Sequence, residues 1–237
     1  MKIDTAQIPA WQLSFEKTPE IVESEEAAVR SMEKTDAPKP RDPNAEFYSR
    51  VELPWLAKTT NGEVHPFYRQ LSEEKLNEIR DDFLNKLQKK AAESLRTMFD
   101  SFLSLRDNLS YTNPELAKKY FGFTLGFDQQ VKITDPDGVL TPAEAAFLTE
   151  QLNNRAGFQE ALVTHARSLM EQVDHDRKRF PDRYKINLEN FSKIIDYGQL
   201  FIRNTIGGFI KTLNYQLERN AEKIEEKKPE SLIDVHA

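Results

Sequence analysis

The sequence predicts a mainly α-helical protein in which two long amphipathic helices pack with shorter helices and with one small β-hairpin or strand element. Three observations support this fold class. Apolar residues recur at three- and four-residue steps over 72–109 and again over 187–227, which indicates two long helices. Between 121 and 133 the apolar spacing changes to two, as in a strand. Before residue 45 neither pattern is sustained, so we expect a disordered N-terminal arm.

The chain divides by composition into three predicted parts. Residues 1–44 are rich in Glu, Lys, Pro, Ser and Thr, and their scattered apolar side chains cannot bury enough surface to offset the entropy of ordering. We therefore predict a disordered acidic, proline-containing arm over 1–44, a single mostly helical domain over 45–227 and a flexible tail over 228–237. Within the domain, residues 47–67 contain prolines and an Asn-Gly turn, and predict an extended strap anchored by its aromatic side chains.

The first long helix has a well-marked start. Ser72 is a preferred N-cap residue, and two glutamates follow it at the positive end of the helix dipole. Leu71 and Leu76 flank this cap as a hydrophobic staple. We expect a second long helix to pack along the apolar stripe of the first. That stripe is Leu76, Ile79, Phe83, Leu87, Ala91, Leu95, Met98, Phe102, Leu105 and Leu109.

Three shorter elements are predicted after the first long helix. Asn113 with Pro114 at the first helical position predicts a short helix. The alternation over 121–133 predicts a strand or small hairpin. Thr141 then opens a capping box with Glu144 as its third residue, which predicts another helix.

Two further helices complete the predicted domain. The first carries an apolar face from Phe158 to Val173 and is expected to end near Arg179, before a Phe-Pro pair. The second is expected to run from about Asn187 to Lys227. Its stripe is Phe191, Ile195, Gly198, Ile202, Thr205, Phe209, Leu213, Leu217 and Ile224.

Composition excludes several classes of function. The 237 residues include 30% charged residues, the net charge is -6 and the pI is about 5.4, so we expect no nucleic-acid partner. No run of about 18 apolar residues occurs, and the N-terminus lacks a basic region followed by an apolar one. We therefore expect no stable membrane insertion and a cytoplasmic location, or export by a route without a cleavable secretory signal. The absence of cysteine excludes disulfides and thiolate metal sites.

Residues 135–144 support two interpretations. The segment resembles part of an EF-hand calcium loop, with Asp135 and Asp137 at its third and fifth positions, the Val139 carbonyl at the seventh and Glu144 at the twelfth. The resemblance covers about ten residues, and Ile133 stands where the first ligand of such a loop belongs. The alternative interpretation is an Asp-Pro-Asp-Gly turn that leads into a capped helix. The possible metal is calcium, and no other cofactor is expected.

The histidines suggest structural roles. His165 lies in the middle of an apolar helical face without a carboxylate or second histidine within helical reach, which predicts a hydrogen-bonded core residue. The run Asp174-His175-Asp176 resembles a metal-ligand cluster, but consecutive helical residues point in different directions. We interpret His175 with Glu171 as a solvated pair on a polar face.

No catalytic motif is present: the sequence lacks a nucleophile elbow, a phosphate-binding loop and a His-Glu-x-x-His pair. We therefore predict a non-enzymatic interaction or structural protein that binds a protein partner through the arm and the helical surface, with homo-oligomers allowed by the long helices. One alternative is a calcium-responsive protein that uses residues 135–144. Another is a substrate or effector of a specialised secretion system.

Overall fold

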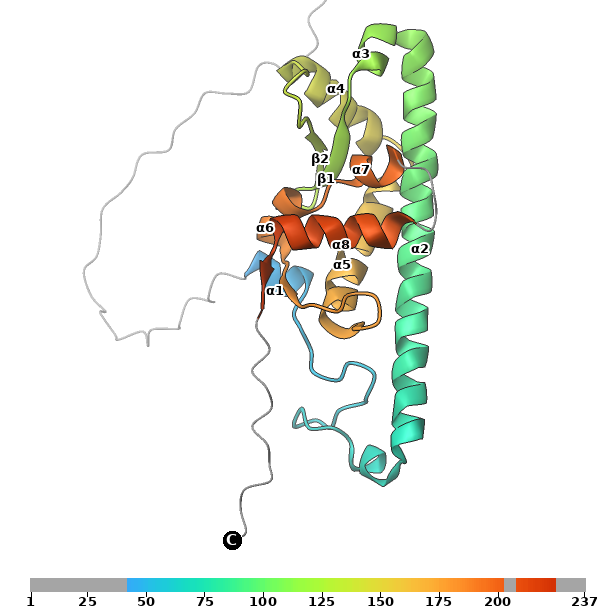
Figure 1. Ribbon diagram of the computed structural model, residues 1–237, viewed down its shortest axis with the longest axis vertical. Helices are drawn as coiled ribbons and strands as arrows, with labels where there is room; N and C mark the ends of the chain where they lie inside the picture. The colour runs from blue at the N-terminus through green and yellow to red at the C-terminus, as the bar shows by residue number, and fades with distance from the viewer. Residues whose placement is uncertain (1–41, 203–207, 225–237) are drawn as a thin grey trace, which may run out of the picture. The chain divides into compact units, whose positions relative to one another are not determined.

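The computed structural model describes residues 42–202 and 208–224, all of which belong to one compact unit of the chain (Figure 1). The prediction of a mainly α-helical fold with one small hairpin is confirmed. Most of the predicted arm and the whole predicted tail lie outside the described residues. The elements are α1 Pro43–Phe47, η2 Pro66–Gln70, α2 Glu73–Thr112, α3 Pro114–Lys118, β1 Gly122–Leu125, β2 Val131–Thr134, α4 Pro142–Asn153, α5 Phe158–His175, β3 Tyr184–Lys185, α6 Leu188–Ile194, α7 Tyr197–Ile202, α8 Phe209–Asn220 and β4 Glu222–Lys223.

The first long helix is α2, and it begins as predicted. The Ser72 hydroxyl accepts a hydrogen bond from the Lys75 amide, and the 40 residues of α2 give a length of about 60 Å at 1.5 Å per residue. Its stripe is buried from Leu87 onward, and the main packing partner is α5. Since α5 has 18 residues, it covers less than half of α2.

The prediction of one continuous second long helix over 187–227 is wrong, because this range contains several shorter elements. The chain forms α6, turns, forms α7, and then forms α8 and the strand β4, which pairs with β3. The break has a local cause: Ile195 leaves helical geometry, and the Asp196 carboxylate accepts the Gly198 amide at 2.8 Å, so that a new helix begins there. Of the predicted stripe, Phe191, Ile195, Leu213 and Leu217 are buried, whereas Ile224 is exposed.

Strand β1 of the hairpin is fully buried in the apolar core, whereas β2 is only partly buried. β1 pairs with β2 in antiparallel register, with Thr124 opposite Lys132 and Phe123 opposite Ile133. The Phe123 ring is fully buried and stacks on the Tyr197 ring of α7 at 5.4 Å. The hairpin is therefore held by a core that includes α2, α4, α5 and α7.

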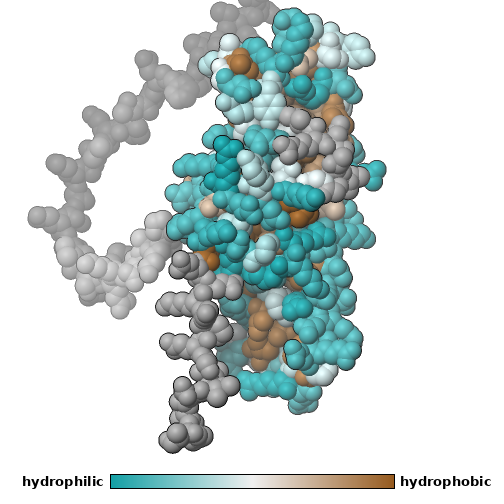
Figure 2. Space-filling view, viewed as in Figure 1, coloured by the Kyte–Doolittle hydropathy of each residue, from teal (hydrophilic) through white to brown (hydrophobic). Residues whose placement is uncertain are grey.

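The chain between α1 and η2, residues 48–65, forms a strap as predicted, but it is not extended throughout, because it folds through turns closed by a Lys58–Val64 bridge. The Trp55 ring lies 6.1 Å from the Phe83 ring of α2 and 5.8 Å from the His175 ring of α5, and Leu56 is buried beside it. Its aromatic anchor is thereby confirmed. Val51 and Leu53 remain exposed, and Figure 2 shows apolar side chains gathered on this lower part of the domain, while most of the displayed face is hydrophilic.

Candidate functional site

The outer edge of β2 is an unpaired strand edge on the described surface. The hairpin turn closes with a hydrogen bond from the Gly126 amide to the Gln130 carbonyl, and Gln129 adopts a φ of 61°. Because hydrogen-bonded pairs alternate along an antiparallel ladder, Lys132 bonds to β1, whereas the amide and carbonyl groups of Val131 and Ile133 point away from it. Among residues 42–202 and 208–224, no hydrogen bond reaches these outward groups.

The corresponding edge of β1 is covered. The Asp196 carboxylate lies against it, and the amides of Gly198, Gln199 and Phe123 point toward this carboxylate. Burial raises the pKa of Asp196, and the Thr134 side chain, followed by these amides, opposes the shift by stabilising the charged form. The small sheet therefore has one protected edge, β1, and one open edge, β2.

A groove runs between the open edge of β2 and the flank of α4. Its volume is about 590 Å³, and small residues form the α4 wall, so the helix leaves room beside the strand. In Figure 1, β2 lies on the side of β1 away from α2. We call this site the edge groove, and it is lined by Gly126, Phe127, Asp128, Val131, Lys132, Ile133, Ala145, Ala146 and Thr149.

The sequence places α4 in this position through its N-terminal cap. Thr141 and Glu144 form the predicted capping box, and the Glu144 carboxylate also accepts hydrogen bonds from the Lys119 ammonium at 2.7 Å. The Lys119 hydrogen bond, followed by those from Thr141, lowers the pKa of Glu144 to about 2. The start of α4 is thereby tied to the segment that leads into β1, which fixes one wall of the edge groove.

Charge in the edge groove is unevenly distributed. Lys132 is exposed and has no ion pair with any residue that the structure describes. Asp128 lies at the turn end, where its carboxylate accepts the Gln130 amide at 3.0 Å. The apolar part of the lining comes from Val131 and Ile133, and from the half-exposed Phe127 ring.

The residues predicted to bind calcium have local structural partners. Both oxygens of Asp135 accept backbone amides, those of Val139 at 3.1 Å and Leu140 at 2.8 Å. Asp137 is exposed and the Glu144 carboxylate is shared between Lys119 and Thr141. Within the described ranges, no group of three or more His, Asp or Glu side chains is arranged to hold a metal ion. This geometry fits the turn-and-cap interpretation, and calcium binding stays a prediction.

His165 is a core residue, as predicted. Its ring is buried, and Nδ1 lies 2.8 Å from the Tyr197 hydroxyl oxygen. Burial lowers the pKa of His165 to about 4, so the ring is neutral near pH 7.

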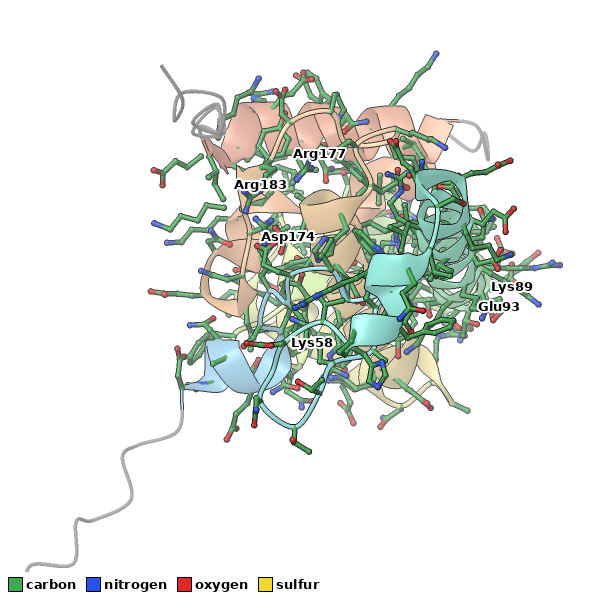
Figure 3. All side chains as sticks on the ribbon, turned by 90° about the horizontal axis from the view of Figure 1, so that it is seen from below. Lys58, Lys89, Glu93, Asp174, Arg177 and Arg183 are labelled. Atoms are coloured by element: carbon green, nitrogen blue, oxygen red, sulfur yellow. The ribbon has the colours of Figure 1, made fainter. Side chains whose placement is uncertain are left out.

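The run Asp174-His175-Asp176 contributes to three separate contacts. Asp174 accepts the Tyr48 hydroxyl at 2.7 Å, and Figure 3 shows it on α5 near the strap. His175 is not part of a solvated pair as predicted, because its ring packs edge-on against Trp55. Asp176 is buried and accepts a hydrogen bond from the Gln88 side chain at 3.0 Å.

The end of α5 also differs from the prediction. The helix ends at His175 and not near Arg179, because Asp176 leaves helical geometry with φ -96° and ψ 80°. The Asp176 carboxylate then accepts the Arg179 amide at 3.2 Å and closes a turn.

Comparison with known protein families, curated protein sequences and solved structures finds no match to this chain. None of the helices in the described ranges is long and apolar enough to cross a membrane. Sequence reasoning found the hairpin and the α4 cap but missed the edge groove between them. The sequence pattern that could have predicted the edge groove is the alternation around Lys132, followed within a few residues by a helix with small side chains on one flank.

Proposed function

We propose that this protein is a non-enzymatic binding protein that holds a protein partner by pairing an extended segment of that partner with β2. The observation that supports the proposal is the open edge of β2 beside an apolar groove. Unpaired amide and carbonyl groups on a strand edge form a template for another strand. Strand addition of this type obtains affinity from main-chain hydrogen bonds and specificity from side-chain pockets.

The two outward residues define the bonding capacity of the edge. Val131 and Ile133 each offer one amide donor and one carbonyl acceptor in the direction of the edge groove. An added strand would use all four groups without disturbing the pairing of β2 with β1. The α4 wall would then cover the apolar side chains of the added strand.

The N-terminal arm, residues 1–44, belongs to this proposal as a second binding segment, as the sequence predicts. Its role can be measured separately, because the edge groove is built entirely from residues 126–149. Partner recovery that is unchanged in a chain without residues 1–41 would remove the arm from the mechanism.

The test uses a labelled extended peptide and a variant that fills the edge groove. The probe is the heptapeptide Ser-Thr-Val-Glu-Val-Thr-Ser, and its binding to the full chain is followed by fluorescence anisotropy. Ala146→Trp places a large side chain on the α4 wall and is expected to weaken binding at least tenfold. Ala143→Trp is the matched control, since Ala143 is also exposed on α4 but does not line the edge groove. Equal binding by the wild type and both variants would contradict the proposal.

A further inference from the structure

We propose that the edge groove selects an extended segment with the pattern apolar–acidic–apolar, whose acidic side chain lies opposite Lys132. This inference rests on the proposed function, strand addition to β2, and specifies the chemistry of the partner. It follows from the register of β2 and from the charges around the edge groove.

Register determines which residues of the added strand face which residues of β2. In an antiparallel arrangement, Val131 and Ile133 each form a hydrogen-bonded pair with one residue of the partner, and the partner residue between those two lies opposite Lys132. Side chains of directly opposite residues lie on the same face of the sheet. The side chains of the three central partner residues therefore lie beside those of Val131, Lys132 and Ile133, one opposite each.

The flanking partner residues meet an apolar surface. Val131 belongs to the buried core, and Ile133 packs against the same core while lining the edge groove. Ala145 and Thr149 form the facing wall and leave space for a branched aliphatic side chain. Valine, isoleucine or leucine at the flanking positions would bury apolar area and would also suit an extended backbone.

The central partner residue meets a positive charge. Lys132 is exposed, and it has no ion pair within residues 42–202 and 208–224. Its cross-strand neighbour on β1 is Thr124, which is buried and uncharged. Opposite charges in a cross-strand pair are favourable and like charges directly opposite are unfavourable, so Lys132 favours Glu or Asp at this position.

The remaining charges of the edge groove do not offset this preference. Glu144 precedes the α4 wall and already shares its charge with the Lys119 ammonium. Asp128 lies at the end of the edge groove formed by the hairpin turn. There its negative charge disfavours an acidic residue in the part of the partner that extends past the three central residues. The preference for an acidic side chain therefore applies only to the partner residue opposite Lys132.

A charge-reversal cycle tests the inference. Two peptides that differ only in a central Glu or Lys, Ser-Thr-Val-Glu-Val-Thr-Ser and Ser-Thr-Val-Lys-Val-Thr-Ser, are titrated against the wild type and against Lys132→Glu by fluorescence anisotropy. We expect the wild type to bind the Glu peptide about tenfold more tightly at low salt and Lys132→Glu to reverse the order. The difference should shrink in 0.5 M salt, because exposed charges are screened.

Lys211→Glu is the matched control, because it makes the same change in net charge at an exposed position of α8, away from the edge groove. This variant should keep the wild-type preference, and unchanged melting temperatures would show that both variants fold. Equal affinity of the wild type for the two peptides would overturn the selection by Lys132 and leave strand addition standing. Failure of both peptides to bind any of these proteins would overturn strand addition itself.

Discussion

Gly122 of β1 and Gly198 of α7 touch backbone to backbone: a Cβ atom added to Gly198 would lie 2.3 Å from the Gly122 Cα atom. This contact lets the Asp196 carboxylate reach the outer edge of β1, where a Cβ atom on Gly122 would lie 2.2 Å from its Oδ1 atom. The two glycines therefore protect one edge of the hairpin by bringing a helix against it. The other edge, β2, has no such cover among the described residues, and the proposed function depends on this asymmetry.

The close contact predicts that Gly198→Ala destabilises the fold. In most helical positions this substitution stabilises, because glycine costs conformational entropy. Here the added methyl group has no space, so we expect the free energy of unfolding to fall by about 1–3 kcal/mol. Chemical denaturation measures the change, and Lys193→Ala at an exposed position of α6 should change stability by no more than about 0.5 kcal/mol. A stabilised Gly198→Ala variant would refute the contact.

The alternating bonding of β2 predicts an alternating pattern of amide hydrogen exchange. The amides of Lys132 and Thr134 bond to β1 and should exchange slowly, whereas those of Val131 and Ile133 point outward and should exchange faster. Exchange followed residue by residue by NMR measures the difference. Addition of the Glu-centred peptide should slow exchange at Val131 and Ile133 only. Exchange at Val131 and Ile133 as slow as that at Lys132 and Thr134 in the free protein would show that the outer edge of β2 is already paired.

The sequence was a good guide where one local signal determined one element. The cap at Ser72, the stripe of α2 and the capping box at Thr141 each depend on residues a few positions apart, so periodicity and capping chemistry identified them. The alternation around Phe123 likewise identified the hairpin.

The sequence was a poor guide where a side chain interrupts a regular stripe. Asp196 falls on the polar side of the predicted second long helix, and nothing in the spacing shows that its carboxylate caps a new helix at Gly198. The edge groove was missed for a related reason. It depends on which edge of the hairpin α7 covers, and that is decided by the contact between Gly122 and Gly198, 76 positions apart in the sequence.

The buried pair of His165 and Tyr197 predicts a loss of stability in mild acid. Burial lowers the pKa of His165 to about 4, whereas an unfolded chain's histidine titrates near 6.5. Above pH 6.5 the ring is neutral in both states. Between pH 6.5 and 4 the unfolded state takes up a proton that the folded state does not, so the free energy of unfolding falls, by up to about 3 kcal/mol at pH 4.

A double variant isolates this effect. His165→Phe with Tyr197→Phe removes the titrating ring and its hydroxyl partner together, so no buried polar group is left unpaired. Urea denaturation between pH 4 and 7.5 should show a shallower slope in the double variant than in the wild type. Other titrating groups, such as His175, contribute to both proteins and cancel in the difference. Identical slopes would show that His165 does not titrate as its burial requires.

The turn at residues 135–140 predicts a structural role for Asp135. Its carboxylate accepts the amides of Val139 and Leu140, so Asp135→Ala should lower the free energy of unfolding by about 1–2 kcal/mol whether or not calcium is present. The exposed Asp137 is the matched comparison, and Asp137→Ala should have little effect. A calorimetric titration with millimolar calcium that gives no heat would support the turn-and-cap interpretation. A calcium-dependent rise in melting temperature that disappears in Asp137→Ala would instead support the calcium prediction.

The strap, residues 48–65, is expected to open locally when Trp55 is removed. Trp55 contacts the rings of Phe83 and His175, and each such aromatic contact contributes about 0.5–1.5 kcal/mol beyond apolar burial. Trp55→Ala should therefore raise the rate of tryptic cleavage after Lys58 about tenfold or more, because cleavage requires the strap to leave the surface. Val51→Ala is the matched control, since this side chain belongs to the strap and is 46% exposed. Equal acceleration in both variants would show that general loosening of the strap, and not the Trp55 anchor, governs cleavage.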